Sequence, residues 1–161
     1  MNPSETLVHL QGICKSFGSV HANKDVELLV KRGSIHALVG ENGAGKTTLM
    51  KILFGLEQAD AGEILYDNHK VEINSPQQAM TLGIGMVHQH FMLVPSLTVA
   101  ENVILGQEPR QGLRLDLSAA QRLVREVSTR YGLAVEPDAR VRDLPVGLQQ
   151  RVEIIKALSQ G

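Results

Sequence analysis

The chain contains little of what marks several specialised classes of protein. Its 161 residues include one cysteine, Cys14, so an internal disulfide framework is excluded, and a lone thiol suits a reducing compartment. A formal net charge of −1 argues against a general polyanion-binding surface, and we expect no nucleic-acid partner. Hydrophobic residues at 43% and charged residues at 20% are typical of one ordinary folded domain.

Charged residues are also missing from one long stretch, residues 73–100. The stretch is long enough to span a bilayer, but its centre holds His88, Gln89 and His90, which would be costly in hydrocarbon. We therefore expect soluble structure that is buried or forms an interface. Two histidines without a third ligand are weak evidence for zinc, so we interpret both as structural. The first ten residues, MNPSETLVHL, lack the basic and apolar regions of a signal peptide.

The first third of the chain has the pattern of β-strands. Residues 7–13 and 25–30 are short runs of strand-forming residues bounded by glycine and polar residues. Residues 63–66 and 71–73 flank a polar turn, which predicts a hairpin. The apolar run at residues 35–39 ends at a glycine, and we expect it to form a buried central strand of a parallel sheet.

Helix signals dominate from residue 75 onward. Ser75 followed by Pro76 is a helix start that Gly83 can close, after which residues 84–87 return to a strand pattern. A capping box at residues 98–101 opens a second helix, which Gly106 can end.

A second capping box at residues 118–121 opens a longer helix that Gly132 can close. Its apolar stripe consists of Ala120, Leu123, Val124, Val127 and Tyr131. The last helix has one apolar face made of Leu148, Val152, Ile155 and Leu158. Strands followed by helices in this way predict an α/β fold.

A glycine-rich segment at residues 40–48, GENGAGKTT, matches the pattern G-x-x-x-x-G-K-[ST]. Its glycines let the backbone curl around a phosphate so that successive N–H groups point inward, and the following helix adds its own N-terminal donors. The lysine can reach the β- and γ-phosphates, and the first threonine can ligate Mg²⁺. The residues expected to hold the nucleotide are Gly40, Glu41, Asn42, Gly43, Ala44, Gly45, Lys46, Thr47 and Thr48.

Three segments, at residues 35–55, 83–106 and 149–158, resemble the nucleotide-binding subunits of ABC transporters. The resemblance covers essentially the whole chain and is strongest toward bacterial importers of nucleosides and simple sugars. It implies a P-loop NTPase (RecA-like) core with an ABC-type antiparallel β subdomain and a helical subdomain, incomplete at the C-terminus. Within one partial domain, the implied parts are a β-rich core (1–89), a helical subdomain (90–147) and the start of the signature helix (148–161).

The resemblance also assigns roles to two residues outside the phosphate loop. Phe17 matches the aromatic residue that stacks on adenine, although a core phenylalanine on a strand would be the simpler interpretation of the residue alone. Gln89 matches the glutamine that meets Mg²⁺ and the attacking water, which would make Lys46 and Gln89 the catalytic residues of this chain.

The segment Pro145, Val146 and Gly147 aligns with the signature motif of the family. In the family this motif starts a helix whose N-terminus faces the γ-phosphate held by a second domain in a head-to-tail dimer. Pro145 replaces a serine, which removes a hydroxyl and a backbone N–H. We therefore hypothesise that the signature surface of this chain is weakened.

Hydrolysis in the family also needs an acidic strand end and a switch histidine, which follow the signature helix. No matching segment occurs up to Gly161, and we interpret Asp67 as a turn residue and Asp116 as part of a helix cap. We hypothesise that the chain is a fragment or truncated product with exposed apolar surface where the missing strand would pack.

The resemblance implies the ATP-binding subunit of an importer, using ATP and Mg²⁺ at the cytoplasmic face of the inner membrane. Its partners would be a second nucleotide-binding domain, transmembrane permease subunits and, indirectly, a solute-binding protein. A truncated, non-hydrolysing nucleotide-binding module is the alternative. A GTPase or small kinase is a third possibility, but Asn23-Lys24-Asp25 places its aspartate one position too early for N-K-x-D.

Overall fold

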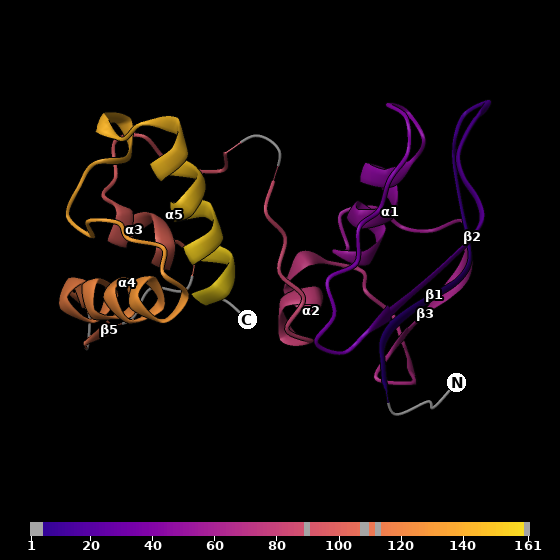
Figure 1. Cartoon of the computed structure of the whole chain (residues 1–161), viewed down its shortest axis with the longest axis horizontal. Coiled ribbons are helices and arrows are strands. Elements are labelled where there is room, and N and C mark those ends of the chain that lie inside the picture. Colours follow the sequence, from indigo (N-terminus) through magenta and orange to yellow (C-terminus); the bar gives the residue numbers. More distant parts are fainter. Residues whose placement is uncertain (1–4, 89–90, 107–109, 112–113, 160–161) are drawn as a thin grey trace. The chain divides into compact units, whose positions relative to one another are not determined.

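The computed structural model describes residues 5–88, 91–106, 110–111 and 114–159. The chain divides into two compact units, an N-terminal unit (residues 1–82) and a C-terminal unit (residues 83–161) (Figure 1). Helices and antiparallel strands are both present, so the predicted mixed α/β composition is confirmed.

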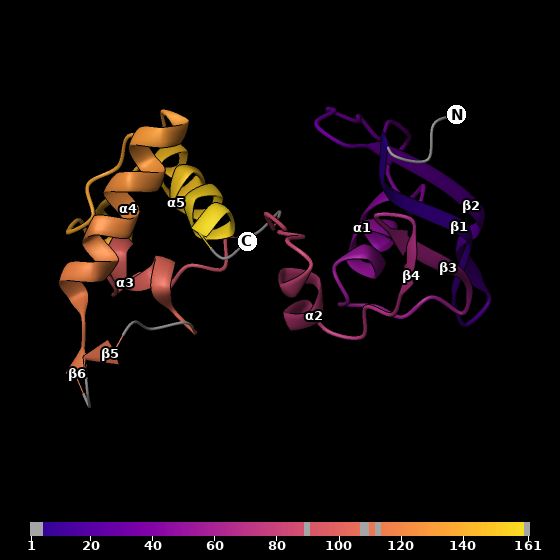
Figure 2. The ribbon, with the colours of Figure 1, turned by 90° about the horizontal axis from the view of Figure 1, so that it is seen from below.

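The N-terminal unit contains a four-stranded antiparallel sheet (Figure 2). Its strands are β1 (Thr6–Phe17), β2 (Val20–Lys31), β3 (Ala61–Tyr66) and β4 (His69–Val71), in the order β2-β1-β3-β4. The first two strands and the hairpin were predicted from the sequence, and both long strands extend further than expected. The hairpin turn is tighter than predicted, because only Asp67 and Asn68 separate the strands, both with positive φ.

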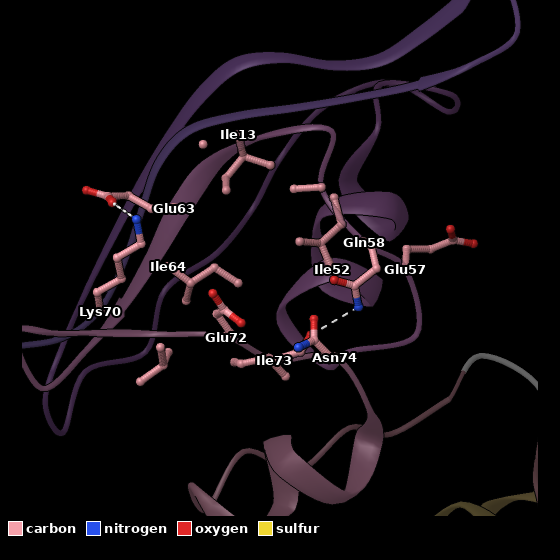
Figure 3. Close-up of a pocket in the computed structure, with 13 residues that line it drawn as sticks. Ile13, Ile52, Glu57, Gln58, Glu63, Ile64, Lys70, Glu72, Ile73 and Asn74 are labelled. Atoms are coloured by element: carbon pink, nitrogen blue, oxygen red, sulfur yellow. Dashed lines mark hydrogen bonds and ion pairs between the residues drawn. The ribbon is translucent and has the colours of Figure 1, made fainter.

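Helix α1 (Lys46–Leu53) buries its apolar residues and contacts β2 of this sheet. Leu49 and Ile52 are 2% exposed, and the same core includes Leu10 and Ile13 of β1. Figure 3 shows Ile13, Ile52 and Ile64 around a pocket, which has a volume of about 390 Å³. Polar side chains, among them Gln58 and Glu72, also line this pocket. The helix that follows the phosphate loop thus contacts β2 and lines one pocket together with residues of β1 and β3.

The predicted central strand at residues 35–39 is wrong. Residues 34–41 form neither helix nor strand, and Ile35 and Val39 are 102% and 90% exposed. An apolar run becomes a strand only when neighbouring backbones complete its hydrogen bonds, and every ladder of the described sheets is antiparallel and excludes this run. Residues 84–87 likewise lie outside any strand, against the prediction for them.

Helix α2 (Pro76–Thr81) closes the N-terminal unit as predicted. The Ser75 side chain accepts a hydrogen bond from the backbone N–H of Gln78 at 3.3 Å, and Pro76 occupies the first helical position. Gly83 follows the helix with a φ of 77°, the left-handed conformation that ends helices.

Three helices form the C-terminal unit, α3 (Val99–Ile104), α4 (Leu117–Tyr131) and α5 (Val146–Ser159). A short 3₁₀ turn, η2 (Val141–Asp143), precedes α5, and a small hairpin of β5 (Arg110–Gln111) and β6 (Arg114–Leu115) precedes α4. Each helix contacts the other two. Their shared core consists of Val99, Ala100, Val103, Ile104, Ala120, Val124, Val127, Val152 and Ile155.

The capping box of α3 is confirmed in full. Thr98 Oγ1 accepts from the N–H of Glu101 at 3.2 Å, and Glu101 Oε2 accepts from the N–H of Thr98 at 2.7 Å. Gly106 follows the helix with a φ of 90°.

The capping box predicted at Ser118 is wrong, because the N-cap of α4 lies two residues earlier. Asp116 is the N-cap, and its carboxylate accepts from the N–H of Ala119 at 2.9 Å. Asp116 is thus a cap residue, as expected, and Gly132 ends the helix with a φ of 67°. Tyr131, the last residue of α4, is 47% exposed, so this member of the predicted apolar stripe lies outside the core.

None of the helices in the described part of the chain is long and apolar enough to cross a membrane.

Core packing of α5 can be tested by shortening one buried side chain. Ile155 is fully buried, so Ile155→Ala should lower the free energy of unfolding by about 2–5 kcal/mol, through lost apolar contact and a residual cavity. Leu158 on the same helix is 38% exposed, and Leu158→Ala is the matched control, expected to cost less than about 1 kcal/mol. Urea unfolding followed by circular dichroism measures both, and equal losses would contradict the packing described.

Candidate functional site

The phosphate loop turns sharply between residue 40 and the first turn of α1. Gly43 and Gly45 have φ of 86° and 80°, a conformation that other residues rarely adopt. Gly45 is the N-cap of α1, and a Cβ at this position would lie 2.0 Å from the carbonyl oxygen of Ala22. Only glycine therefore fits at the junction of loop and helix.

The Lys46 ammonium lies across the loop. Its Nζ donates to the carbonyl oxygens of Gly40 at 2.6 Å and Glu41 at 2.7 Å. Carbonyl partners orient the ammonium without neutralising it, and no carboxylate pairs with Lys46 in the described residues. The ammonium has three N–H donors, and the two carbonyls use two of them. Its positive charge and its third donor can therefore bind an anion at this loop.

The remaining loop residues are open to solvent. Glu41, Asn42 and Ala44 are exposed, and the N–H of Ala44 donates to the Glu41 carbonyl at 3.2 Å, which closes the turn. Thr47 is exposed at the first turn of α1, while Thr48 is partly buried. The structure thus brings all nine predicted loop residues, 40–48, together around one helix N-terminus.

Phe17 lies at the end of β1, and the residue is 47% exposed. It is therefore not the core phenylalanine of the simpler interpretation, and its ring offers an aromatic face. Lys15 Nζ lies 5.4 Å from the ring centroid and pairs with Asp60 Oδ1 at 3.2 Å. Asp60 Oδ2 also accepts from the N–H of Ser16 at 2.7 Å, so the backbone next to Phe17 is held in place.

Gln89 and His90 lie outside the described residues, and the role predicted for Gln89 stays a prediction. His88 is partly buried. Over the described ranges, no group of three or more His, Cys, Asp and Glu side chains could hold a metal ion.

The segment that follows Gln89 is held by buried polar side chains that the sequence analysis missed. Glu153 of α5 is 3% exposed, and its Oε1 accepts from the N–H of Met92 at 2.6 Å. Asn102 of α3 is fully buried, with Oδ1 accepting from the N–H of Val94 at 2.7 Å and Nδ2 donating to the Val94 carbonyl at 3.1 Å. Polar residues on an otherwise apolar helix face were the available signal.

Residues 145–147 form the open N-terminus of α5. The Pro145 carbonyl accepts from the N–H of Leu148 at 2.9 Å and of Gln149 at 3.1 Å. Val146 is 68% exposed, and no heavy atom lies within 4 Å of where a Cβ on Gly147 would stand. Helix donors at this end therefore face solvent. This segment belongs to the C-terminal unit, and the phosphate loop and Phe17 belong to the N-terminal unit.

The contact between α5 and Met92 can be tested with a pair of variants. Glu153→Leu removes the carboxylate that accepts from the Met92 N–H, and loss of this hydrogen bond should cost about 0.5–1.5 kcal/mol of unfolding free energy. Glu153→Gln keeps an acceptor oxygen and is the matched control. Hydrogen exchange should accelerate at the Met92 amide in the leucine variant alone, and unchanged exchange there would contradict the contact.

A pH-dependent contribution is expected from Asp60. The Ser16 N–H and the Lys15 side chain hold the pKa of this carboxyl below its ordinary value, so the ionised form stabilises the fold. That stabilisation is complete at neutral pH and is lost as the pH falls through the lowered pKa. Asp60→Asn should be less stable than the unchanged chain at neutral pH, with a difference that shrinks below about pH 4. Thermal melts over a pH series measure it, and a pH-independent difference would refute the assignment.

Comparison with known proteins places these features in a family. The family profile described as ABC transporter matches residues 23–161. The chain is 54% identical over 157 residues to the guanosine import ATP-binding protein NupO of Bacillus subtilis, covering 98% of this chain and 31% of that protein. It is 49% identical over 152 residues to the ribose import ATP-binding protein RbsA 1 of Rubrobacter xylanophilus, covering 94% of this chain and 30% of that protein. The chain thus spans about a third of the length of these relatives.

Solved structures show the same fold. A nucleotide-free ATP-binding cassette from an ABC transporter matches with a TM-score of 0.83 at 23% identity, over 96% of this chain and 65% of that one. A dimeric bacterial ABC transporter cassette matches with a TM-score of 0.76 at 26% identity, over 96% of this chain and 70% of that one. The predicted ABC-type fold is therefore confirmed. From the family profile, the relatives and the fold together, the chain belongs to the ABC transporter family.

Proposed function

We propose that this chain binds MgATP and forms the ATP-binding part of an importer subunit. The observation that carries the proposal is the Lys46 ammonium, which is held by two backbone carbonyls and has no carboxylate partner among the described residues. The glycines at positions 43 and 45 allow the close backbone approach that a phosphate needs. The residues of the loop therefore fit the phosphates of a nucleoside triphosphate.

Each loop residue would contribute through a simple interaction. The N–H groups of the other loop residues, Gly40, Glu41, Asn42, Gly43, Gly45 and Thr48, would donate to phosphate oxygens, together with the Lys46 ammonium. Ala44, whose N–H donates to the Glu41 carbonyl, would keep the loop curled around the phosphate. Thr47 is exposed at the first helical turn, and its hydroxyl would hold Mg²⁺, which spreads the negative charge of the phosphates. Phe17, exposed at the end of β1, would cover the adenine ring.

A second nucleotide-binding domain would complete the site. The open helix end at Pro145, Val146 and Gly147 would donate to the γ-phosphate held by that domain. Pro145 brings neither a hydroxyl nor an N–H to this surface, so its contribution would be weaker than that of a serine. Lys46 and Gln89 would be the residues that act on the γ-phosphate and its water.

The names of the relatives suggest which solute the complete transporter would import. Two of them are named as guanosine and nucleoside import ATP-binding proteins and others as ribose import ATP-binding proteins. We therefore propose a nucleoside or simple sugar as the solute. Transmembrane permease subunits would be direct partners and a solute-binding protein an indirect one. The chain would lie at the cytoplasmic face of the inner membrane.

Lys46→Ala tests the proposal directly. Loss of the ammonium should weaken ATP binding at least tenfold, because its charge-assisted hydrogen bonds to phosphate, worth about 1.5–3 kcal/mol, are lost. Lys51→Ala is the matched control, since Lys51 lies on the same helix, outside the phosphate loop, and should leave affinity unchanged. Titration calorimetry with ATP and Mg²⁺ measures both variants.

The same titration decides between the outcomes. An unchanged chain that does not bind ATP, or a Lys46→Ala variant that binds as well as the unchanged chain, would refute the proposal. Release of inorganic phosphate by the unchanged chain then separates an ATPase from the alternative, a nucleotide-binding module without turnover.

A further inference from the structure

Asn23, near the start of β2, contacts the residue at which the phosphate loop ends and α1 begins. The side chain is 6% exposed, and its Nδ2 donates to the carbonyl oxygen of Gly45 at 3.3 Å. The contact joins residues 22 positions apart in the chain. It lies outside the glycine-rich motif, so the motif alone does not reveal it.

The backbone of β2 also limits the space around Gly45. A Cβ on Gly45 would lie 2.0 Å from the Ala22 carbonyl oxygen and 2.8 Å from Asn23 Nδ2. Gly45 therefore rests directly on β2 with no room to spare. Because a glycine has wide backbone freedom, its left-handed φ of 80° needs such an outside contact to be maintained.

The Gly45 carbonyl has a second partner, the N–H of Leu49 at 2.9 Å, which makes the first hydrogen bond of α1. Asn23 and Leu49 thus bind the same oxygen. The direction of this carbonyl sets the direction of the first helical turn, and with it the free N–H groups of residues 46–48. Asn23 is therefore coupled to the donors that face a phosphate.

Packing does not account for an amide at this position. Asn23 Oδ1 is buried and has no hydrogen-bond partner in the described part of the chain. A buried acceptor without a partner is unfavourable, and a leucine of similar size would avoid that cost. What the amide provides and a leucine does not is the hydrogen bond to Gly45.

We propose that Asn23 is a positioning residue of the phosphate loop, which holds the Gly45 carbonyl so that the first amides of α1 point at the bound phosphate. The proposal rests on the nucleotide binding proposed above. Without the Asn23 donor, Gly45 can adopt conformations other than its left-handed one. The phosphate loop would then populate conformations that do not bind nucleotide.

Two substitutions separate this role from a purely structural one. Asn23→Leu removes the donor and fills the space, and should keep or raise the free energy of unfolding. Asn23→Ala removes the same donor but leaves a cavity, and should lower it. Both variants should bind ATP with Mg²⁺ about three- to tenfold more weakly than the unchanged chain, by similar factors, because both lose the same hydrogen bond. Asn74→Leu, at an exposed position of the same unit, is the control for the chemical change and should bind normally.

Affinity is measured by titration calorimetry with ATP and Mg²⁺, and stability by urea unfolding. Hydrogen exchange at the Leu49 amide adds a readout without nucleotide, and it should accelerate in both Asn23 variants. The proposal is overturned if affinity follows stability across the variants, or if both variants bind like the unchanged chain. If the unchanged chain itself does not bind ATP, the proposed function fails, whereas unchanged exchange at Leu49 in both variants overturns the positioning role alone.

Discussion

The contact between Gly45 and the backbone of β2 is the constraint on which the N-terminal unit depends. No side chain fits between Gly45 and the Ala22 carbonyl, so only glycine lets the loop approach β2 this closely. Helix α1 begins at the next residue and buries Leu49 and Ile52 in the core of this unit. The position of the loop and the start of the helix are therefore linked through one backbone contact.

Buried polar side chains have a corresponding role in the C-terminal unit. Residues 92–94 have no strand partner, yet the backbone groups of Met92 and Val94 are satisfied by Glu153 and Asn102. Because backbone polar groups need hydrogen-bond partners, these buried side chains supply bonds that a strand ladder would otherwise supply. Helices α3 and α5 are thereby joined to a segment of irregular backbone.

Local signals predicted the parts of the fold that depend on neighbouring residues. The capping box at Thr98, the helix ends at Gly83, Gly106 and Gly132, and the phosphate loop all follow from side chains within a few positions of each other. The run at residues 35–39 failed because a buried strand requires partner strands that residue type does not specify. Asn23 and Glu153 escaped prediction for the same reason, since their partners are 22 and 61 positions away.

The amino-acid sequence thus decides where the phosphate loop is, which residues can enter it and where most helices begin and end, because these depend on backbone freedom and short-range hydrogen bonds. Tertiary structure decides which carbonyls hold Lys46, which strand supports Gly45 and which carboxylate holds Met92. Those contacts join distant segments, and their geometry exists only once apolar packing has brought the segments together.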